Sequence, residues 1–122
     1  MNEKRVDWIG SSKKDLLAMP VEVRRTFGFA LGLAQNNLPY EDAKTLTGFG
    51  LPLVEILEDD DGDTYRAVYT ARVDDVIYVL HCFKKKSTRG RNIPKRDKET
   101  IEARVAEVQR REAQRAKEKR KI

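Results

Sequence analysis

Cysteine, histidine and long apolar runs are nearly absent from this chain of 122 residues, which contains one cysteine, Cys82, and one histidine, His81. A single cysteine excludes an internal disulfide framework, and together with one histidine it cannot form a Cys/His zinc cluster. No apolar run approaches the length that spans a membrane, and the N-terminus lacks the apolar segment of a signal peptide. We therefore expect a cytoplasmic protein that uses no metal, no small-molecule cofactor and no membrane.

Charged residues are abundant and unevenly distributed. They make up 37% of the chain against 39% apolar residues, which is typical of one globular domain with a heavily charged surface. The formal net charge of +5 favours nucleic acid or another anionic surface as partner. Residues 55–63 include six acids and no base, whereas residues 84–96 include seven bases and no acid. We interpret the acidic run as a solvated turn and the basic run as a candidate contact for a polyanion.

The N-terminal third is predicted to form a short strand followed by two helices. The strand is expected at residues 5–10. Ser12 and Asp15 have the spacing of a capping box, so Ser12 is expected to open a helix that ends near Pro20. From residue 20 to about residue 36, apolar residues recur at three- and four-residue spacing and indicate an amphipathic helix. The two helices are expected to form an antiparallel hairpin on one face of a sheet.

The middle of the chain is predicted to form an antiparallel meander after a long loop at residues 38–52. The predicted strands are 53–58, 64–72 and 76–83. Asp61-Gly62 and Asp74-Asp75 supply the turn chemistry between them. The last of the three strands is apolar at both parities, so it is expected to be central and covered on both faces.

The C-terminal part is predicted to be a helix from Pro94 to about Arg110. Beyond Arg111 the sequence has almost nothing to bury, and either a solvent-facing helix with i,i+4 charge pairs or a frayed tail fits it. The predicted fold class is therefore α+β. It has a small antiparallel sheet, made of the meander and the N-terminal strand, with two N-terminal helices on one face and a C-terminal helix.

An ordered set of motifs along residues 7–108 resembles the phage-derived, HigB-like branch of the RelE/ParE superfamily of bacterial toxins. The motifs are Trp-Ile-Gly-Ser-Ser-Lys-Lys-Asp-Leu at 8–16, Lys-Thr-Leu-Thr-Gly-Phe-Gly at 44–50, Thr-Tyr-Arg-Ala-Val-Tyr at 64–69, Tyr-Val-Leu-His-Cys-Phe-Lys-Lys-Lys-Ser at 78–87 and Pro-Lys-Arg-Asp at 94–97. The basic segment after Arg110 lies outside the resemblance. The division it suggests is a RelE-like toxin domain at 1–110 and a basic tail or helix extension at 111–122.

The resemblance implies a toxin of a type II toxin–antitoxin pair. Such toxins usually cleave mRNA on the ribosome and are neutralised by a cognate antitoxin, which in this branch is commonly a helix-turn-helix protein. The partners implied are therefore the antitoxin, mRNA and ribosomal RNA. A gyrase poison of the ParE type, or a nucleic-acid-binding phage remnant without activity, remains an alternative because one scaffold serves several functions.

Metal-independent RNA cleavage needs a base for the ribose 2′-OH and cations for the charge that develops on the phosphate. A chain with one histidine cannot use two, so clustered cations or a lysine of lowered pKa must serve. Arg66 matches the family's strand arginine, and its planar guanidinium suits a phosphate. The alternative is an exposed strand arginine paired with Glu55 or Asp75. We expect Lys84 and Lys86 to share a face and act with Arg66, and Lys85 to point to the other side.

Further residues are candidates for RNA contact without a catalytic role. They are Arg72, Lys85, Lys44, Arg89, Arg91 and Tyr69, the last as a base-stacking ring. His81 has the opposite strand parity to Lys84, and a lone histidine in an apolar strand is usually packed and hydrogen-bonded. The sequence therefore favours a structural role for His81.

Overall fold

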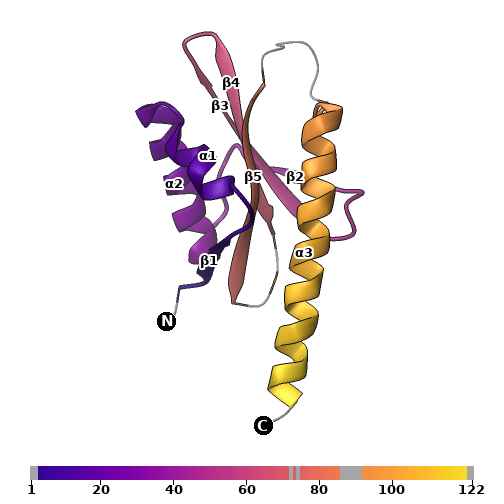
Figure 1. Cartoon of the computed structure of the whole chain (residues 1–122). Helices are drawn as coiled ribbons and strands as arrows, with labels where there is room; N and C mark the ends of the chain where they lie inside the picture. The colour runs from indigo at the N-terminus through magenta and orange to yellow at the C-terminus, as the bar shows by residue number, and fades with distance from the viewer. Residues whose placement is uncertain (1–2, 72, 74, 86–91, 121–122) are drawn as a thin grey trace.

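The computed structural model describes residues 3–71, 73, 75–85 and 92–120. Within them the chain forms a five-stranded sheet with helices on both faces (Figure 1). The elements are β1 (Arg5–Trp8), α1 (Ser12–Leu17), α2 (Val21–Gln35), β2 (Lys44–Leu46), β3 (Leu53–Asp60), β4 (Asp63–Thr70), β5 (Val76–Lys85) and α3 (Lys95–Arg120). The α+β class and the order of the long elements are as the sequence predicts.

The sheet has the strand order β1-β5-β4-β3-β2. β3, β4 and β5 form the predicted antiparallel meander. Two features differ from the prediction. β1 pairs with β5 in parallel, so the sheet is mixed rather than antiparallel. This is possible because no hairpin joins the two strands, and the whole chain between them makes the connection. The segment predicted as loop also contributes the short edge strand β2.

Each face of the sheet has its own hydrophobic core. On one face α1 and α2 bury Leu16, Val23 and Phe27 against β3, β4 and β5. On the other face α3 buries Ile101 and Val105 against residues of the same strands. The prediction that β5 is apolar at both parities because it is covered on both faces is confirmed.

The start of α1 differs from the predicted capping box. The helix begins after Ser11, whose hydroxyl donates to the carboxylate of Asp15 at 2.7 Å and makes no cap bond to the backbone. Ser12 is fully buried, and its Oγ donates to the backbone carbonyl of Val79 at 3.0 Å. A buried hydroxyl needs such a partner. Ser12 therefore anchors α1 to β5 rather than capping the helix.

The turn between β3 and β4 follows the predicted chemistry. Asp61 and Gly62 both have positive φ, of 48° and 83°. A two-residue turn with this backbone matches the right-handed twist of the strands it joins, and glycine tolerates it without strain. In the second predicted turn, Asp74 lies outside the described residues.

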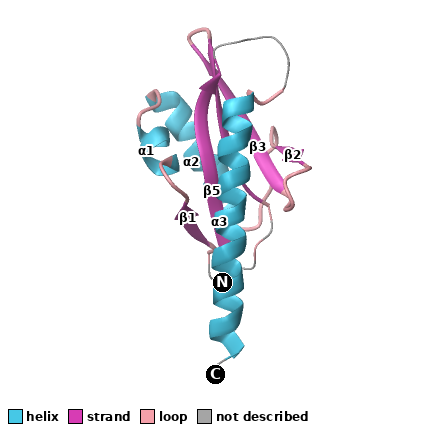
Figure 2. Ribbon diagram, turned by 45° about the vertical axis from the view of Figure 1, so that its right-hand side comes forward, coloured by secondary structure: helices cyan, strands magenta, loops and turns pink. Residues whose placement is uncertain are grey.

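The C-terminal helix continues well past residue 110. α3 is one helix of 26 residues that projects beyond the sheet at its C-terminal end (Figures 1 and 2). Its distal part keeps contact with the turn before β5, because Arg115 pairs with Asp75 at 2.6 Å. Of the two alternatives for this segment, the structure has the helix. No helix among the described residues has the length and apolar character needed to cross a bilayer.

Candidate functional site

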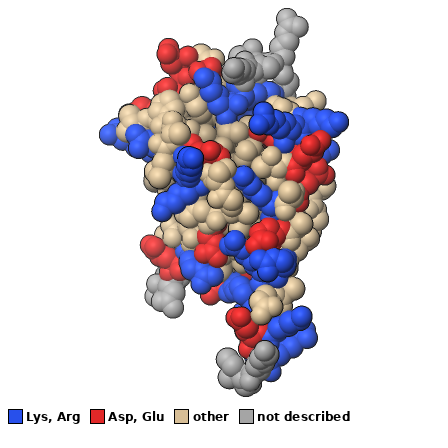
Figure 3. All heavy atoms as spheres, in the orientation of Figure 1, with Lys and Arg blue, Asp and Glu red and all other residues tan. Residues whose placement is uncertain are grey.

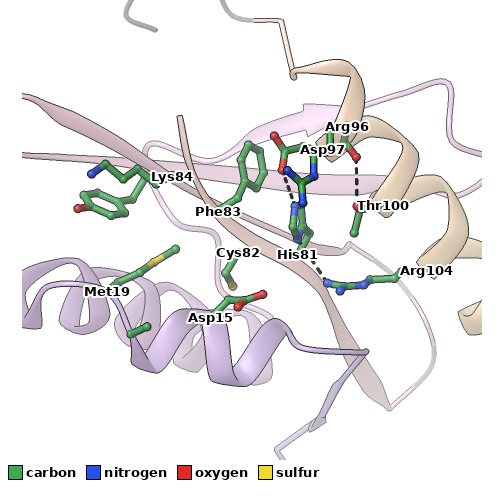
Figure 4. Close-up of a pocket in the computed structure, with 12 residues that line it drawn as sticks. Asp15, Met19, His81, Cys82, Phe83, Lys84, Arg96, Asp97, Thr100 and Arg104 are labelled. Atoms are coloured by element: carbon green, nitrogen blue, oxygen red, sulfur yellow. Dashed lines mark hydrogen bonds and ion pairs between the residues drawn. The ribbon is translucent and has the colours of Figure 1, made fainter. Parts of the chain in front are cut away.

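A cleft of about 660 Å³ lies beside the second half of β5, between α1 and the beginning of α3 (Figure 4). It exists because β1 pairs with only the first four residues of β5, Val76 to Val79, so that within the described residues this edge of β5 has no further strand. Its lining includes His81 and the charged residues Asp15, Lys84, Arg96, Asp97 and Arg104. Segments distant in the sequence thus contribute to one hollow.

A β-bulge turns His81 toward α3. The register places Val68 opposite His81 but Tyr69 opposite Val79, so Leu80 is an extra residue on β5. Leu80 packs in the core beneath α3, and His81 bonds to residues of the same helix. Bulges redirect side chains in this way near functional sites. The bulge therefore brings the single imidazole of the chain to the cleft.

Both ring nitrogens of His81 have partners on α3. Nε2 lies 2.8 Å from Oδ1 of Asp97, and Nδ1 lies 3.3 Å from Nη1 of Arg104. Arginine only donates, so Nδ1 accepts and the ring proton is assigned to Nε2, which donates to Asp97. The ring also stacks on Phe83, with 4.7 Å between centroids. Burial lowers the pKa of His81, and Asp97 opposes that shift only in part.

Arg104 is held in place by β5 and by the turn between β1 and α1. Nη1 donates to the carbonyl of Leu80 at 2.8 Å, and Nη2 donates to Oγ of Ser11 at 3.1 Å. Gly10 provides the space for the guanidinium, because a Cβ at this position would lie 2.8 Å from Nε of Arg104. Gly10 also has φ of 57°, which a side chain disfavours. The glycine and Ser11, both in the first family-like motif, thus position a cation at the cleft.

The cleft carries three cations against two carboxylates. Figure 4 shows His81 between Asp97 and Arg104, with Lys84 pointing toward the other end of the hollow. Arg96 completes the cationic set. On the face shown in Figure 3, blue and red side chains are interspersed rather than forming one uniform basic field. Attraction for an anion therefore depends on local geometry in the cleft, not on the net charge alone.

Cys82 also lines the cleft, but it is not a reactive thiol. Its side chain is buried, and burial raises its pKa to about 12. It therefore stays protonated at neutral pH, as a small apolar residue. Among the residues that the structure describes, no three His, Cys, Asp or Glu side chains gather closely enough to hold a metal ion.

Arg66 lies outside this cleft. It occupies the α3 face of β4, where its Nη1 pairs with Oε2 of Glu55 at 3.2 Å. Only 2% of Arg66 and 4% of Glu55 are exposed to solvent. Burial raises the pKa of Glu55, and Arg66 and Lys44 counteract that shift. The alternative of a paired strand arginine is therefore realised, but the pair is buried.

Lys84 and Lys85 do not lie on the faces that the sequence predicts. Lys85 lies opposite Thr64 on the face of Arg66, is 7% exposed and donates from Nζ to the carbonyl of Asn92 at 2.9 Å. Lys84 lies on the opposite face and pairs with Asp63 at 2.9 Å. Strand alternation separates neighbours but does not say which of them faces Arg66, and here it is Lys85. The hydrogen bond to Asp63 raises the pKa of Lys84, which is contrary to a lysine base.

The remaining predicted contacts are dispersed. Lys44 is exposed on the edge strand β2, opposite Glu55. Tyr69 is 4% exposed and packs under α2, away from the face of Arg66, and burial raises its pKa to about 12. Four more predicted residues lie outside the described part of the chain. They are Arg72, Lys86, Arg89 and Arg91.

The sequence interpretation missed the contribution of α3. His81 is packed and hydrogen-bonded as predicted, yet its partners also make it part of a cleft. Arg96 and Asp97 belong to a motif that the family resemblance already contains, and Arg104 follows Asp97 by seven residues, on the same side of a helix. The spacing of Asp97 and Arg104 on one side of a helix, together with the single histidine, could have indicated that α3 contributes to the site.

Comparison with known proteins gives one family. The family model described as Phage derived protein Gp49-like (DUF891) matches residues 14–106, which is most of the chain and includes the cleft residues from Asp15 to Arg104. No curated protein matches the chain. The chain belongs to the Gp49-like family of phage-derived proteins, a toxin-like family associated with toxin–antitoxin systems.

Proposed function

We propose that this protein is the toxin of a type II toxin–antitoxin pair and that it cleaves mRNA on the ribosome without a metal. Family membership supports the toxin role. The observation that carries the enzymatic part is the cleft, in which a hydrogen-bonded His81–Asp97 pair lies beside Arg96 and Arg104. The proposed partners are mRNA, ribosomal RNA and a helix-turn-helix antitoxin.

The cleft has the components that RNA cleavage needs. A volume of about 660 Å³ suits a small ligand such as one nucleotide with its phosphate. Guanidinium groups bind phosphate through paired hydrogen bonds and stabilise the charge that develops when the 2′-oxygen attacks. Arg96 and Arg104 supply two such groups on one helix at the cleft, and Nη1 of Arg104 lies 3.3 Å from Nδ1 of His81.

We assign the scissile phosphate to this cleft rather than to Arg66. A phosphate can contact a guanidinium only where solvent can reach it, and Arg66 is 2% exposed and paired with Glu55. Moving Arg66 to a phosphate would leave Glu55 buried without its arginine, which is strongly unfavourable. In this proposal the Glu55–Arg66 pair holds β3 and β4 together beneath the site.

The test is to induce the chain alone in growing bacteria and to map transcript 5′ ends. We expect growth arrest with new 5′ ends inside translated reading frames. Arg96→Gln removes one cleft cation and is expected to lower cleavage about tenfold, the loss of one phosphate contact. Lys98→Gln is the matched control, because Lys98 is exposed on the same helix and does not line the cleft.

Other results would replace the proposal with its rivals. DNA-damage signalling with intact mRNA would indicate a gyrase poison. Absence of toxicity and of cleavage would indicate a remnant that binds nucleic acid or nothing. Equal loss of cleavage in Arg96→Gln and Lys98→Gln would indicate general electrostatic attraction rather than a site. The antitoxin part of the proposal predicts that the neighbouring helix-turn-helix protein, when co-expressed, restores growth.

A further inference from the structure

We propose that Nδ1 of His81 is the proton acceptor of the cleavage reaction, held by Asp97 and uncovered when an RNA phosphate takes the hydrogen bond of Arg104. This inference rests on the proposed function and adds to it the identity of the base. It reverses the structural role that the sequence favours for His81. The hydrogen bonds of His81 and Arg104 in the cleft support it.

The hydrogen bonds leave one nitrogen of His81 with a lone pair. Nε2 donates to Asp97 at 2.8 Å, a contact that fixes the ring and its tautomer. Nδ1 accepts from Nη1 of Arg104 at 3.3 Å, which is longer than a strong hydrogen bond. The acceptor nitrogen is therefore the one with the weaker partner, and that partner is the group a phosphate would bind.

Arg104 can exchange this partner without leaving its place. Nη1 carries two hydrogens, of which one goes to the carbonyl of Leu80 at 2.8 Å and the other to Nδ1 of His81. Nη2 remains bonded to Ser11 at 3.1 Å. A phosphate oxygen forms a stronger, charge-assisted bond with a guanidinium than a neutral imidazole does. A small shift of one N–H then leaves the lone pair of Nδ1 free to accept a proton from the ligand.

The surroundings keep the base neutral until it is used. Besides Asp97 and Arg104, the charged groups that line the cleft around His81 are Arg96 from α3, Asp15 from α1 and Lys84 from β5. Burial and the positive charge of Arg104 lower the pKa of His81, and Asp97 and Asp15 raise it less. The imidazole is therefore unprotonated at neutral pH, the state that a general base requires. Once it holds a proton, the carboxylate of Asp97 stabilises it.

The cleavage step moves one proton and exchanges one phosphorus–oxygen bond for another. Nδ1 of His81 takes the proton of the 2′-OH, and the 2′-oxygen forms a bond to the adjacent phosphorus. The bond between phosphorus and the 5′-oxygen breaks, and that oxygen takes a proton from solvent water. The products are a 2′,3′-cyclic phosphate and a free 5′-OH. Nothing is oxidised or reduced, and the imidazolium returns its proton to solvent after release.

The first test is NMR of the whole protein, in which the only histidine gives one unambiguous imidazole signal. We expect ¹⁵N shifts of the Nε2–H tautomer and a pKa below the ordinary value. A dinucleotide with a 2′-deoxyribose, which cannot be cleaved, is expected to shift the Nδ1 resonance. A predominant Nδ1–H tautomer would overturn the proposal, whether or not the protein cleaves RNA.

The second test is single-turnover cleavage of mRNA on programmed ribosomes. His81→Asn is expected to lower the rate by about 10²–10⁴ with unchanged ribosome binding, because general-base catalysis is lost. Asp97→Asn keeps the imidazole and is expected to lower both the pKa of His81 and the cleavage rate. If Asp97 were merely structural, these two quantities would not change together. Wild-type rates in a folded His81→Asn would overturn the inference while leaving the proposed function intact. If the wild-type chain cleaves nothing, the proposed function fails and this base assignment with it.

Discussion

Two polar clusters adjoin Phe83 on the α3 face of the sheet, and they differ in their access to solvent. Arg66 lies opposite Phe83 in the β4–β5 register and pairs with Glu55, and both are almost fully buried. The ring of His81 stacks on Phe83, and its partners Asp97 and Arg104 line an open cleft. An acid and a base at hydrogen-bond distance thus occur twice beside Phe83, once in a buried environment and once at the cleft.

The two clusters differ in whether their charged groups can exchange a protein partner for a ligand. A buried ion pair must keep both members, because either one alone would be a charge without solvation. Groups at a cleft can exchange a protein partner for a ligand, since solvent and ligand reach them. Burial therefore explains why the arginine that the family resemblance selects, Arg66, is the poorer candidate for phosphate. His81 is itself only 8% exposed, and it is the better candidate for chemistry because it lines the cleft together with its partners Asp97 and Arg104.

The largest expected effect comes from breaking the buried pair. Arg66→Ala leaves Glu55 buried without its arginine and is expected to reduce the free energy of unfolding by about 3–5 kcal/mol. Urea denaturation measures this. The matched control is the double variant Glu55→Leu with Arg66→Met, which removes both charges, keeps the volume and is expected to be near wild type in stability.

The same pair of variants tests the catalytic assignment. If the double variant folds and still cleaves mRNA, Arg66 is structural. If it folds and loses cleavage, the sequence-based assignment of the phosphate to Arg66 is restored. A single Arg66→Ala variant of unchanged stability would contradict the structural interpretation of this pair.

A second prediction sharpens the role of Arg104 through the glycine beneath it. Gly10→Ala places a Cβ at 2.8 Å from Nε of Arg104 at a positive φ. Gly48→Ala is the matched control, because Gly48 also has positive φ but an added Cβ there meets no atom within 4 Å. Each change is expected to reduce stability by about 1–2 kcal/mol through backbone strain. Only Gly10→Ala is expected to impair cleavage, and equal cleavage in the two would argue against Arg104 as a positioned cation.

A third prediction uses pH, because a fall in pH changes the contributions of His81 and Glu55 to the free energy of unfolding in opposite directions. The pKa of His81 is lowered in the folded protein, so the unfolded chain binds more protons below about pH 6.5. The contribution of His81 to the free energy of unfolding is therefore complete above that pH and decreases as the pH falls toward the lowered value. The pKa of Glu55 is raised, so its contribution increases as the pH falls through the window above 4.5.

Denaturation of wild type and of His81→Gln over a pH series measures the histidine part. The stability difference between the two proteins is expected to shift against the wild type as the pH is lowered below about 6.5. Parallel curves for the two proteins would mean that His81 titrates alike in the folded and unfolded states. The hydrogen-bonded cluster would then have no effect on the imidazole proton.

Much of the fold follows from local patterns in the sequence. The Asp61-Gly62 turn, the meander and the two-sided burial of β5 depend on neighbours in the chain, and all three are found. The edge strand β2 was missed because three residues, mostly exposed, carry no periodicity. The parallel pairing of β1 was missed because nothing near residues 5–8 determines which strand it joins.

The site was harder to predict than the fold because its geometry depends on register and on distant segments. Strand alternation shows that Lys84 and Lys85 lie on opposite faces of the sheet. Only the pairing of Thr64 with Lys85 shows which of them shares a face with Arg66. The bulge at Leu80 also shifts the alternation of side chains along β5, which changes the face on which His81 lies. The cleft forms where α1, β5 and α3 meet, which no single motif indicates.

The smallest expected effect tests burial against distance. Arg115 and Asp75 lie 2.6 Å apart, closer than Arg66 and Glu55, but the side chain of Asp75 is 77% exposed. Because solvent screens exposed pairs, Arg115→Ala is expected to lower Tm by no more than about 3 °C, with the difference shrinking in high salt. Lys117→Ala on the same helix is the control for lost charge. A loss in Arg115→Ala as large as that of Arg66→Ala would show that contact distance, rather than burial, sets the strength of ion pairs on this face.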